Sequence, residues 1–134
     1  MKQTICRQAT GQGGLPRPNL VPIKVSEIAS HWRLHSDTVR RILLEAGARP
    51  AAASPAMYCW WDIWAIEGCR PLPGEIEAFQ RRLLTPAELR AEYYPFLQAR
   101  AIRTRSQLGS ISAVKLGTEW RYRGCDIRRE KRHG

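Results

Sequence analysis

The sequence lacks the residue groupings on which most enzymes and metalloproteins depend. Its four cysteines form no Cys-x-x-Cys pair, and His31 and His35 have no pair of thiolates or carboxylates at zinc-finger spacing. No Ser-His-Asp set, paired carboxylates or phosphate-binding loop is present. These absences predict a protein that is not an enzyme, that needs no metal or other cofactor, and whose cysteines are free thiols.

Long apolar runs are also missing. The segment 1–14, MKQTICRQATGQGG, has no apolar core of signal-peptide length, and no run approaches the length that crosses a bilayer. We therefore expect a cytoplasmic protein, associated with the nucleoid if it binds DNA, with no membrane partner.

Acidic residues are few compared with basic ones. The chain holds 22 Lys and Arg against 12 Asp and Glu, for a formal net charge of +10, and arginine far outnumbers lysine. The excess is larger in residues 68–134, with fourteen basic and seven acidic residues, than in residues 1–67, with eight and five. Such a balance predicts a polyanionic partner, most simply nucleic acid, which arginine can contact with two parallel hydrogen bonds.

Residues 25–47 have the pattern of two short amphipathic helices. The inward positions are Val25, Ile28, Ala29 and Trp32 in the first helix and Val39, Ile42, Leu43 and Ala46 in the second. We expect a tight turn at 33–35, a cap at Ser36, and an end at Gly47, which supplies a positive φ. Two such helices with arginines on the outer face of the second predict a helix-turn-helix, whose second helix fits the major groove of DNA.

Segments rich in proline and glycine divide the chain. This division predicts a flexible arm over 1–20, a first winged helix-turn-helix over 21–68, a linker with a helix over 69–83, a second winged helix-turn-helix over 84–130, and a basic tail over 131–134. The fold class is therefore mostly α with small β-hairpins.

Within the first domain, residues 51–55 form the expected wing loop. Tyr58 to Trp61 favour a strand, and a closing helix runs from Asp62 to Gly68. The tryptophans are better used as core than as base-stacking platforms, because so small a unit cannot close its core with aliphatic residues alone.

The second half of the chain repeats the first in order. Thr85 to Leu89 parallels Val25 to Ile28, with a capping box between Thr85 and Glu88. Gly109 parallels Gly47, and the four-residue spacing from Tyr58 to Asp62 recurs from Tyr122 to Asp126. A longer turn with Pro95 precedes the second recognition helix, over 99–108, and a hairpin turns near Gly117 and Thr118.

The second domain resembles the excisionase-type, MerR-like winged-helix family. The resemblance rests on LTPAEL (84–89), AIRTRSQLGSISAVKLGTEWRYR (101–123) and the Asp126-Ile127 pair, and the first domain looks like a relative. The segment YCWWDIW (58–64) is also similar to the winged helix of phage small terminase subunits. The resemblance implies a capped first helix, a recognition helix, a wing and a closing helix.

Together these features predict a sequence-specific double-stranded-DNA-binding protein. The residues expected to contact DNA are Ser36, Thr38, Arg40, Arg41, Arg100, Arg103, Thr104, Arg105, Gln107, Lys115, Arg121 and Arg123. The last three are expected on the wing, where they neutralise phosphate. The resemblance implies an architectural factor of a mobile element that acts with an integrase or recombinase and self-associates along DNA. The alternatives are a transcription regulator at an operator and a packaging or scaffold component that acts mainly through protein contacts.

Overall fold

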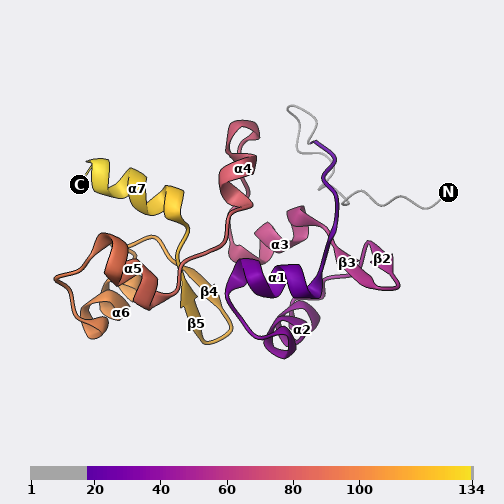
Figure 1. Ribbon diagram of the computed structural model, residues 1–134, viewed down its shortest axis with the longest axis horizontal. Helices are drawn as coiled ribbons and strands as arrows, with labels where there is room; N and C mark the ends of the chain where they lie inside the picture. Colours follow the sequence, from indigo (N-terminus) through magenta and orange to yellow (C-terminus); the bar gives the residue numbers. More distant parts are fainter. Residues whose placement is uncertain (1–17, 134) are drawn as a thin grey trace. The chain divides into compact units, whose positions relative to one another are not determined.

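The computed structural model describes residues 18–133, which are mostly helical with two small antiparallel sheets (Figure 1). Residues 1–17 of the expected arm lie outside the described residues. The described chain forms two compact units. Unit 1 comprises residues 18–30 and 34–76, and unit 2 comprises residues 31–33 and 77–133. Each unit is described by itself.

The first part of the chain runs through three helices, a three-stranded sheet and one 3-10 turn. In order, these elements are β1 (Ile23–Lys24), α1 (Val25–Trp32), α2 (Ser36–Glu45), β2 (Ala52–Ala53), β3 (Ala56–Tyr58), α3 (Trp60–Glu67) and η1 (Pro73–Glu75). The central strand of the sheet is β3, and Ile23 of β1 lies opposite Tyr58. The hairpin of β2 and β3 therefore stands where the wing loop was expected, at residues 51–55.

The two helices of unit 1 have the expected turn and ending. The turn passes through Arg33, which has a φ of 59°, and α2 ends where Gly47 takes a φ of 72°, as predicted. The cap differs from the expectation, because α2 begins at Ser36 and the ring of His35 accepts the hydrogen bond from the Asp37 N–H, at 3.3 Å.

The tryptophans of α3 form core, as predicted. Trp64 is fully buried, stacks on Trp60 at 5.3 Å between ring centroids, and meets Trp61 edge-on at 4.9 Å. The strand expected through Trp61 is wrong, since β3 ends at Tyr58 and α3 begins at Trp60. A strand would place consecutive side chains on opposite faces, whereas a helix brings Trp60, Trp61 and Trp64 into contact.

Unit 2 is built around one small core. Its elements are α4 (Ile76–Phe79, of which Ile76 belongs to unit 1), α5 (Pro86–Tyr93), α6 (Ala99–Leu108), β4 (Val114–Leu116), β5 (Glu119–Arg121) and α7 (Gly124–His133). The buried residues Leu89, Ile102, Ile111, Tyr122 and Ile127 pack together as the core. The hairpin of β4 and β5 turns through Gly117, with a φ of 64°, which confirms the hairpin expected near Gly117.

Two predicted boundaries in this part of the chain are wrong. The helix expected within the linker over 69–83 is only the short α4. Leu84, beyond it, is extended and exchanges both backbone hydrogen bonds with Tyr122, at 2.7 and 3.0 Å. The segment 131–133 was expected as a separate tail and instead continues α7.

Equivalent positions of the internal repeat have equivalent roles. The Lys24 N–H donates to Glu27 Oε1 at 2.9 Å, and the Thr85 N–H donates to Glu88 Oε1 at the same distance. Val39 and Ile102 are both buried in the second helix of their units, and Ile63 and Ile127 are both buried in the closing helix. The pairing of Ile23 with Tyr58 recurs as that of Leu84 with Tyr122. The two units therefore follow one order of elements: extended residue, helix, helix, hairpin, helix.

The capping box of α5 is confirmed and gives unit 2 a dependence on pH. The Thr85 backbone N–H that donates to Glu88 lowers the pKa of this carboxyl, and Arg33, which pairs with it, lowers the pKa further. Because the pKa is lower in the folded state than in the unfolded chain, the stabilisation is complete above the unfolded value of about 4.5 and is lost as the pH falls through the folded value.

We therefore expect Glu88→Gln to destabilise the chain at pH 7 and to unfold at nearly the same urea concentration as the parent at pH 3. Urea unfolding followed by circular dichroism at both pH values measures this. Glu77→Gln, at an exposed position on α4, is the control. Its unfolding midpoint in urea differs from that of the parent by the same small amount at both pH values. A Glu88→Gln deficit that persists undiminished at pH 3 contradicts the electrostatic origin.

Candidate nucleic-acid interface

The outer face of α6 is basic and polar from Arg100 to Gln107, and the exposed Leu108 follows at the end of the helix. Ile102 and Ser106 turn inward and are buried. The opposite positions, spaced i, i+3, i+4 and i+7, are all exposed, and we call them the α6 stripe: Arg100, Arg103, Thr104 and Gln107. Arg105, also exposed, flanks the stripe. The stripe carries guanidinium, hydroxyl and amide groups, which are the groups that read base edges and grip phosphates.

The matching face of α2 has a different chemistry. Its exposed positions at the same spacing, the α2 stripe, are Asp37, Arg40, Arg41 and Leu44. Arg40 Nη1 lies 3.1 Å from Asp37 Oδ1, so one of the two arginines already has an anionic partner. Leu44 is 80% exposed. Ser36 and Thr38, also expected at DNA, are partly buried at the edge of this face.

The hairpin of unit 2 supplies one exposed cation. Lys115 of β4 is exposed, and its Nζ lies 4.4 Å from the ring centroid of Trp120, its partner in the β4–β5 register. This contact with an aromatic face orients the ammonium group without neutralising it. Lys115 thus stands on the hairpin where the sequence placed it.

Arg121 differs from the expectation of an exposed wing residue. Its side chain is only 8% exposed, and its guanidinium donates to the main-chain carbonyls of Trp32 (3.0 Å) and Arg33 (2.8 Å), which belong to unit 2. A guanidinium that is buried and bonded to two carbonyls is held by the protein. Arg121 is a structural residue here, because its side chain points inward from β5 and its guanidinium is too buried to contact a phosphate.

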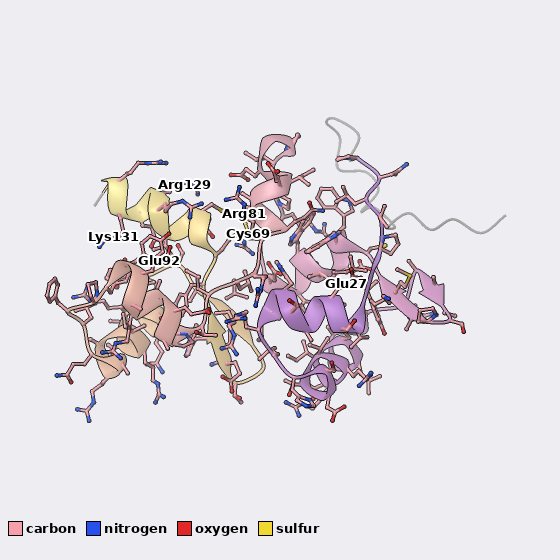
Figure 2. The ribbon with its side chains drawn as sticks, viewed as in Figure 1. Glu27, Cys69, Arg81, Glu92, Arg129 and Lys131 are labelled. Carbon is pink, nitrogen blue, oxygen red and sulfur yellow. The ribbon has the colours of Figure 1, made fainter. Side chains whose placement is uncertain are left out.

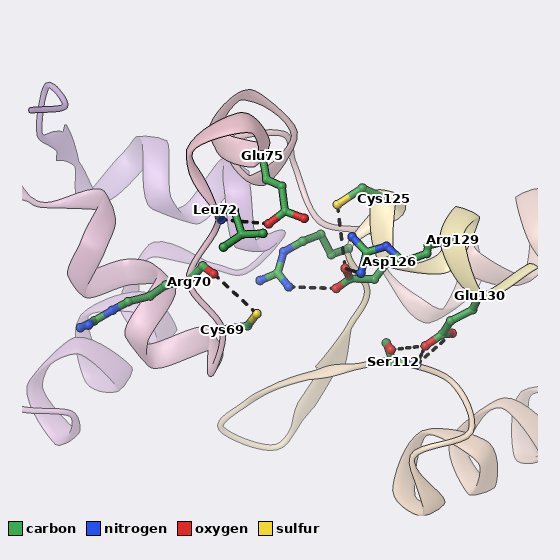
Figure 3. Close-up of polar contacts among 10 residues, drawn as sticks. Cys69, Arg70, Leu72, Glu75, Ser112, Cys125, Asp126, Arg129 and Glu130 are labelled. Carbon is green, nitrogen blue, oxygen red and sulfur yellow. Dashed lines mark hydrogen bonds and ion pairs between the residues drawn. The ribbon is translucent and has the colours of Figure 1, made fainter. Parts of the chain in front are cut away.

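Arg123 is likewise buried, with 3% of its side chain exposed. It pairs with Asp126 at 3.0 Å and lies over the ring of Phe79, 4.1 Å from the centroid. Asp126 also lies 3.7 Å from Arg129, as Figure 3 shows around the first turn of α7. Trp32 and Arg33, which hold Arg121, and Phe79, which lies against Arg123, are distant in the sequence, so the wing pattern gave no sign of them.

The geometry is thus one basic stripe on α6, an exposed lysine on the hairpin of the same unit, and a partly neutralised stripe on α2. Comparison of the chain with known protein families, curated proteins and solved structures finds no match.

Two features of unit 2 have no counterpart in the sequence analysis. Phe96, in the turn between α5 and α6, is 97% exposed. Arg81, Arg82 and Arg128 line a common pocket, although Arg81 and Arg82 had the pattern of ordinary surface charges. Figure 2 labels Arg81 among the side chains near α4. Only their convergence from two segments, the residues after α4 and helix α7, distinguishes these arginines.

One of the cysteines differs from the expectation. Cys59 is disulfide-bonded, which corrects the free thiol expected there, while Cys69 is a free thiol. In residues 18–133 there is no group of three or more His, Cys, Asp or Glu side chains that could hold a metal ion. Over the same residues, none of the helices is long and apolar enough to cross a membrane.

We predict that Arg123→Ala destabilises the chain by about 2–3 kcal/mol, because it removes a charged hydrogen bond and a buried cation–aromatic contact. Arg103→Ala, at an exposed position, changes stability by less than about 0.5 kcal/mol. Urea unfolding of both variants measures the two effects. An Arg123→Ala variant as stable as the parent contradicts the structural role.

Proposed function

We propose that the chain binds double-stranded DNA, with the α6 stripe in the major groove and Lys115 on a neighbouring phosphate. The observation that carries this proposal is the i, i+3, i+4, i+7 placement of Arg100, Arg103, Thr104 and Gln107 on the exposed face of one helix. The proposal includes two winged helix-turn-helix domains in tandem, one in each unit.

The dimensions of α6 suit this role. A helix rises about 1.5 Å per residue, so the stripe from Arg100 to Gln107 extends about 10 Å, the length of about three base pairs. A helix about 10–12 Å across fits a major groove about 12 Å wide. Arg103 lies near the middle of the stripe, so it is the residue with the best access to base edges or to both flanking backbones.

In this proposal the two units contribute unequally. The α6 stripe holds two arginines and no acid, whereas in the α2 stripe Asp37 competes with phosphate for Arg40. Unit 1 therefore adds affinity mainly because it is tethered to unit 2, which makes its own encounter with the same duplex intramolecular.

For the biological role we propose an architectural DNA-binding factor of the excisionase type. Such a factor shapes DNA for a recombinase. A role as operator-binding transcription regulator uses the same contacts. A second candidate, a packaging or scaffold component, is favoured by one observation: Leu44 is 80% exposed in the α2 stripe, where an apolar side chain suits a protein partner better than a phosphate backbone.

Replacing Arg103 tests the proposal. We expect Arg103→Ala to weaken binding to a duplex by about 1–2 kcal/mol, about tenfold. Where Arg103 contacts a phosphate, the magnitude of the slope of log affinity against log salt concentration also falls by about 0.9, the value of one phosphate contact. Fluorescence anisotropy with a labelled duplex at several salt concentrations measures both quantities.

The matched control is Arg132→Ala, which removes the same charge from an exposed position on α7. We expect it to change the affinity less than about twofold. Equal losses for the two variants would show that only net charge matters, and an affinity of the parent chain that does not depend on salt would favour the scaffold candidate.

The Asp37–Arg40 ion pair gives a prediction of opposite sign. If unit 1 lies on the same duplex, Asp37→Asn removes one negative charge from the α2 stripe and releases Arg40, so binding strengthens by about threefold to tenfold at low salt. Glu77→Gln, which removes a similar exposed charge from α4, has little effect. An Asp37→Asn variant that binds no more tightly than the parent shows that α2 does not face DNA.

A further inference from the structure

Unit 2 has a small pocket lined by arginines at the start of α7. The cavity has a volume of about 100 Å³. Its charged and polar lining residues are Arg81, Arg82, Glu92, Tyr93, Arg123 and Arg128. They come from the segment after α4, from the end of α5 and from α7. Three of these residues, Arg81, Arg82 and Arg128, are exposed arginines, whereas Arg123 is already paired with Asp126. The excess of arginine over the single Glu92 favours an anionic occupant.

The local structure holds Arg128 at this pocket. Its Nη1 donates to the Tyr93 hydroxyl at 3.2 Å, and this hydrogen bond raises the pKa of Arg128, so the group stays charged. A Cβ at Gly124 would stand 3.2 Å from the same Nη1, so the glycine leaves room for the guanidinium beside the helix start. Arg81 and Arg82 are exposed, and their side chains are available to an incoming anion.

The chemistry of the lining suits a phosphate group. A guanidinium presents N–H donors in a planar fork that matches two oxygens of a phosphate, and several such forks can share one tetrahedral group. The pocket lies at the first turn of α7, a ten-residue helix whose N-terminal N–H groups add positive potential.

The pocket and the α6 stripe lie on different sides of unit 2. Ile102 of α6 and Ile127 of α7 both face the core, so the core separates the outer surfaces of these two helices. In Figure 1, α7 and α6 lie on opposite sides of the unit with α5 between them. One duplex held along the α6 stripe therefore leaves the pocket open.

We propose that the pocket binds a backbone phosphate of a second DNA duplex while the α6 stripe holds the first. This inference rests on the proposed function and extends it, because a protein with two phosphate-binding faces on one unit bridges two DNA segments. Arg81, Arg82 and Arg128 make the contacts, and Glu92 limits the pocket to one phosphate group rather than a broad polyanion surface.

A capture assay with the full chain tests the proposal. One duplex is immobilised, the chain is added, and retention of a second, fluorescent duplex is measured; anisotropy gives the affinity for a single duplex in parallel. We expect Arg81→Ala/Arg128→Ala to reduce retention by about tenfold or more and to change the single-duplex affinity by less than about twofold. The control Lys24→Ala/Arg132→Ala, with the same charge loss at exposed positions outside the pocket, retains the second duplex.

The possible results separate the sources of phosphate and the two proposals. Equal loss of second-duplex retention in both double variants overturns the pocket as the bridging site. Loss of retention in Arg40→Ala, with retention kept in Arg81→Ala/Arg128→Ala, overturns it as well, because the α2 stripe would then hold the second duplex. If the parent binds one duplex but retains no second, the bridging inference is wrong. Calorimetry with pyrophosphate then tests a small ligand. Binding by the parent and not by Arg81→Ala/Arg128→Ala assigns the pocket to a small phosphate instead. If Arg103→Ala leaves single-duplex binding unchanged, the proposed function itself fails.

Discussion

The rotation of α6 about its axis depends on one buried hydrogen bond. Ser106 Oγ lies 2.6 Å from the Tyr122 hydroxyl and donates to the Ile102 carbonyl at 2.8 Å, so the tyrosine is the donor between the two side chains. Burial raises the pKa of Tyr122, which keeps this donor protonated at neutral pH. With Ser106 and Ile102 fixed inward, the helix period alone places Arg103 on the outer face. Every contact proposed for the α6 stripe follows from this orientation.

The two units show how one arrangement of elements carries different surface chemistry. Leu43 is buried in α2 at the position that Ser106 takes in α6, so the inward side is aliphatic in one unit and hydrogen-bonded in the other. The outward sides differ more, because Asp37 neutralises Arg40 in α2 while the α6 stripe contains no acid. In our account this difference makes unit 2 the principal DNA-binding unit and leaves the outer face of α2 suited to a weaker contact or to a protein partner.

Local signals in the sequence were enough to predict several helix ends, although not the cap of α2 or the start of α3, and the helical spacing of the α6 stripe. The Thr85 capping box, the positive-φ glycines and the helical spacing are properties of short segments, and each was confirmed. The fates of Arg121 and Arg123 could not be predicted, because alternation in a hairpin says which residues share a face but not that a distant carbonyl or the ring of Phe79 will receive the guanidinium. The pocket was missed for the same reason, since its arginines meet only in the folded unit.

The most direct test of the account is an NMR titration of the ¹⁵N-labelled chain with a short duplex, followed residue by residue. We expect the largest shift changes at the amides of α6 from Arg100 to Leu108 and at the β4–β5 turn, with the arginine side-chain signals of the stripe changing at the same duplex concentration. Changes confined to unit 1, or a spectrum that the duplex leaves unchanged, would contradict the claim that the exposed face of α6 is the DNA-binding surface.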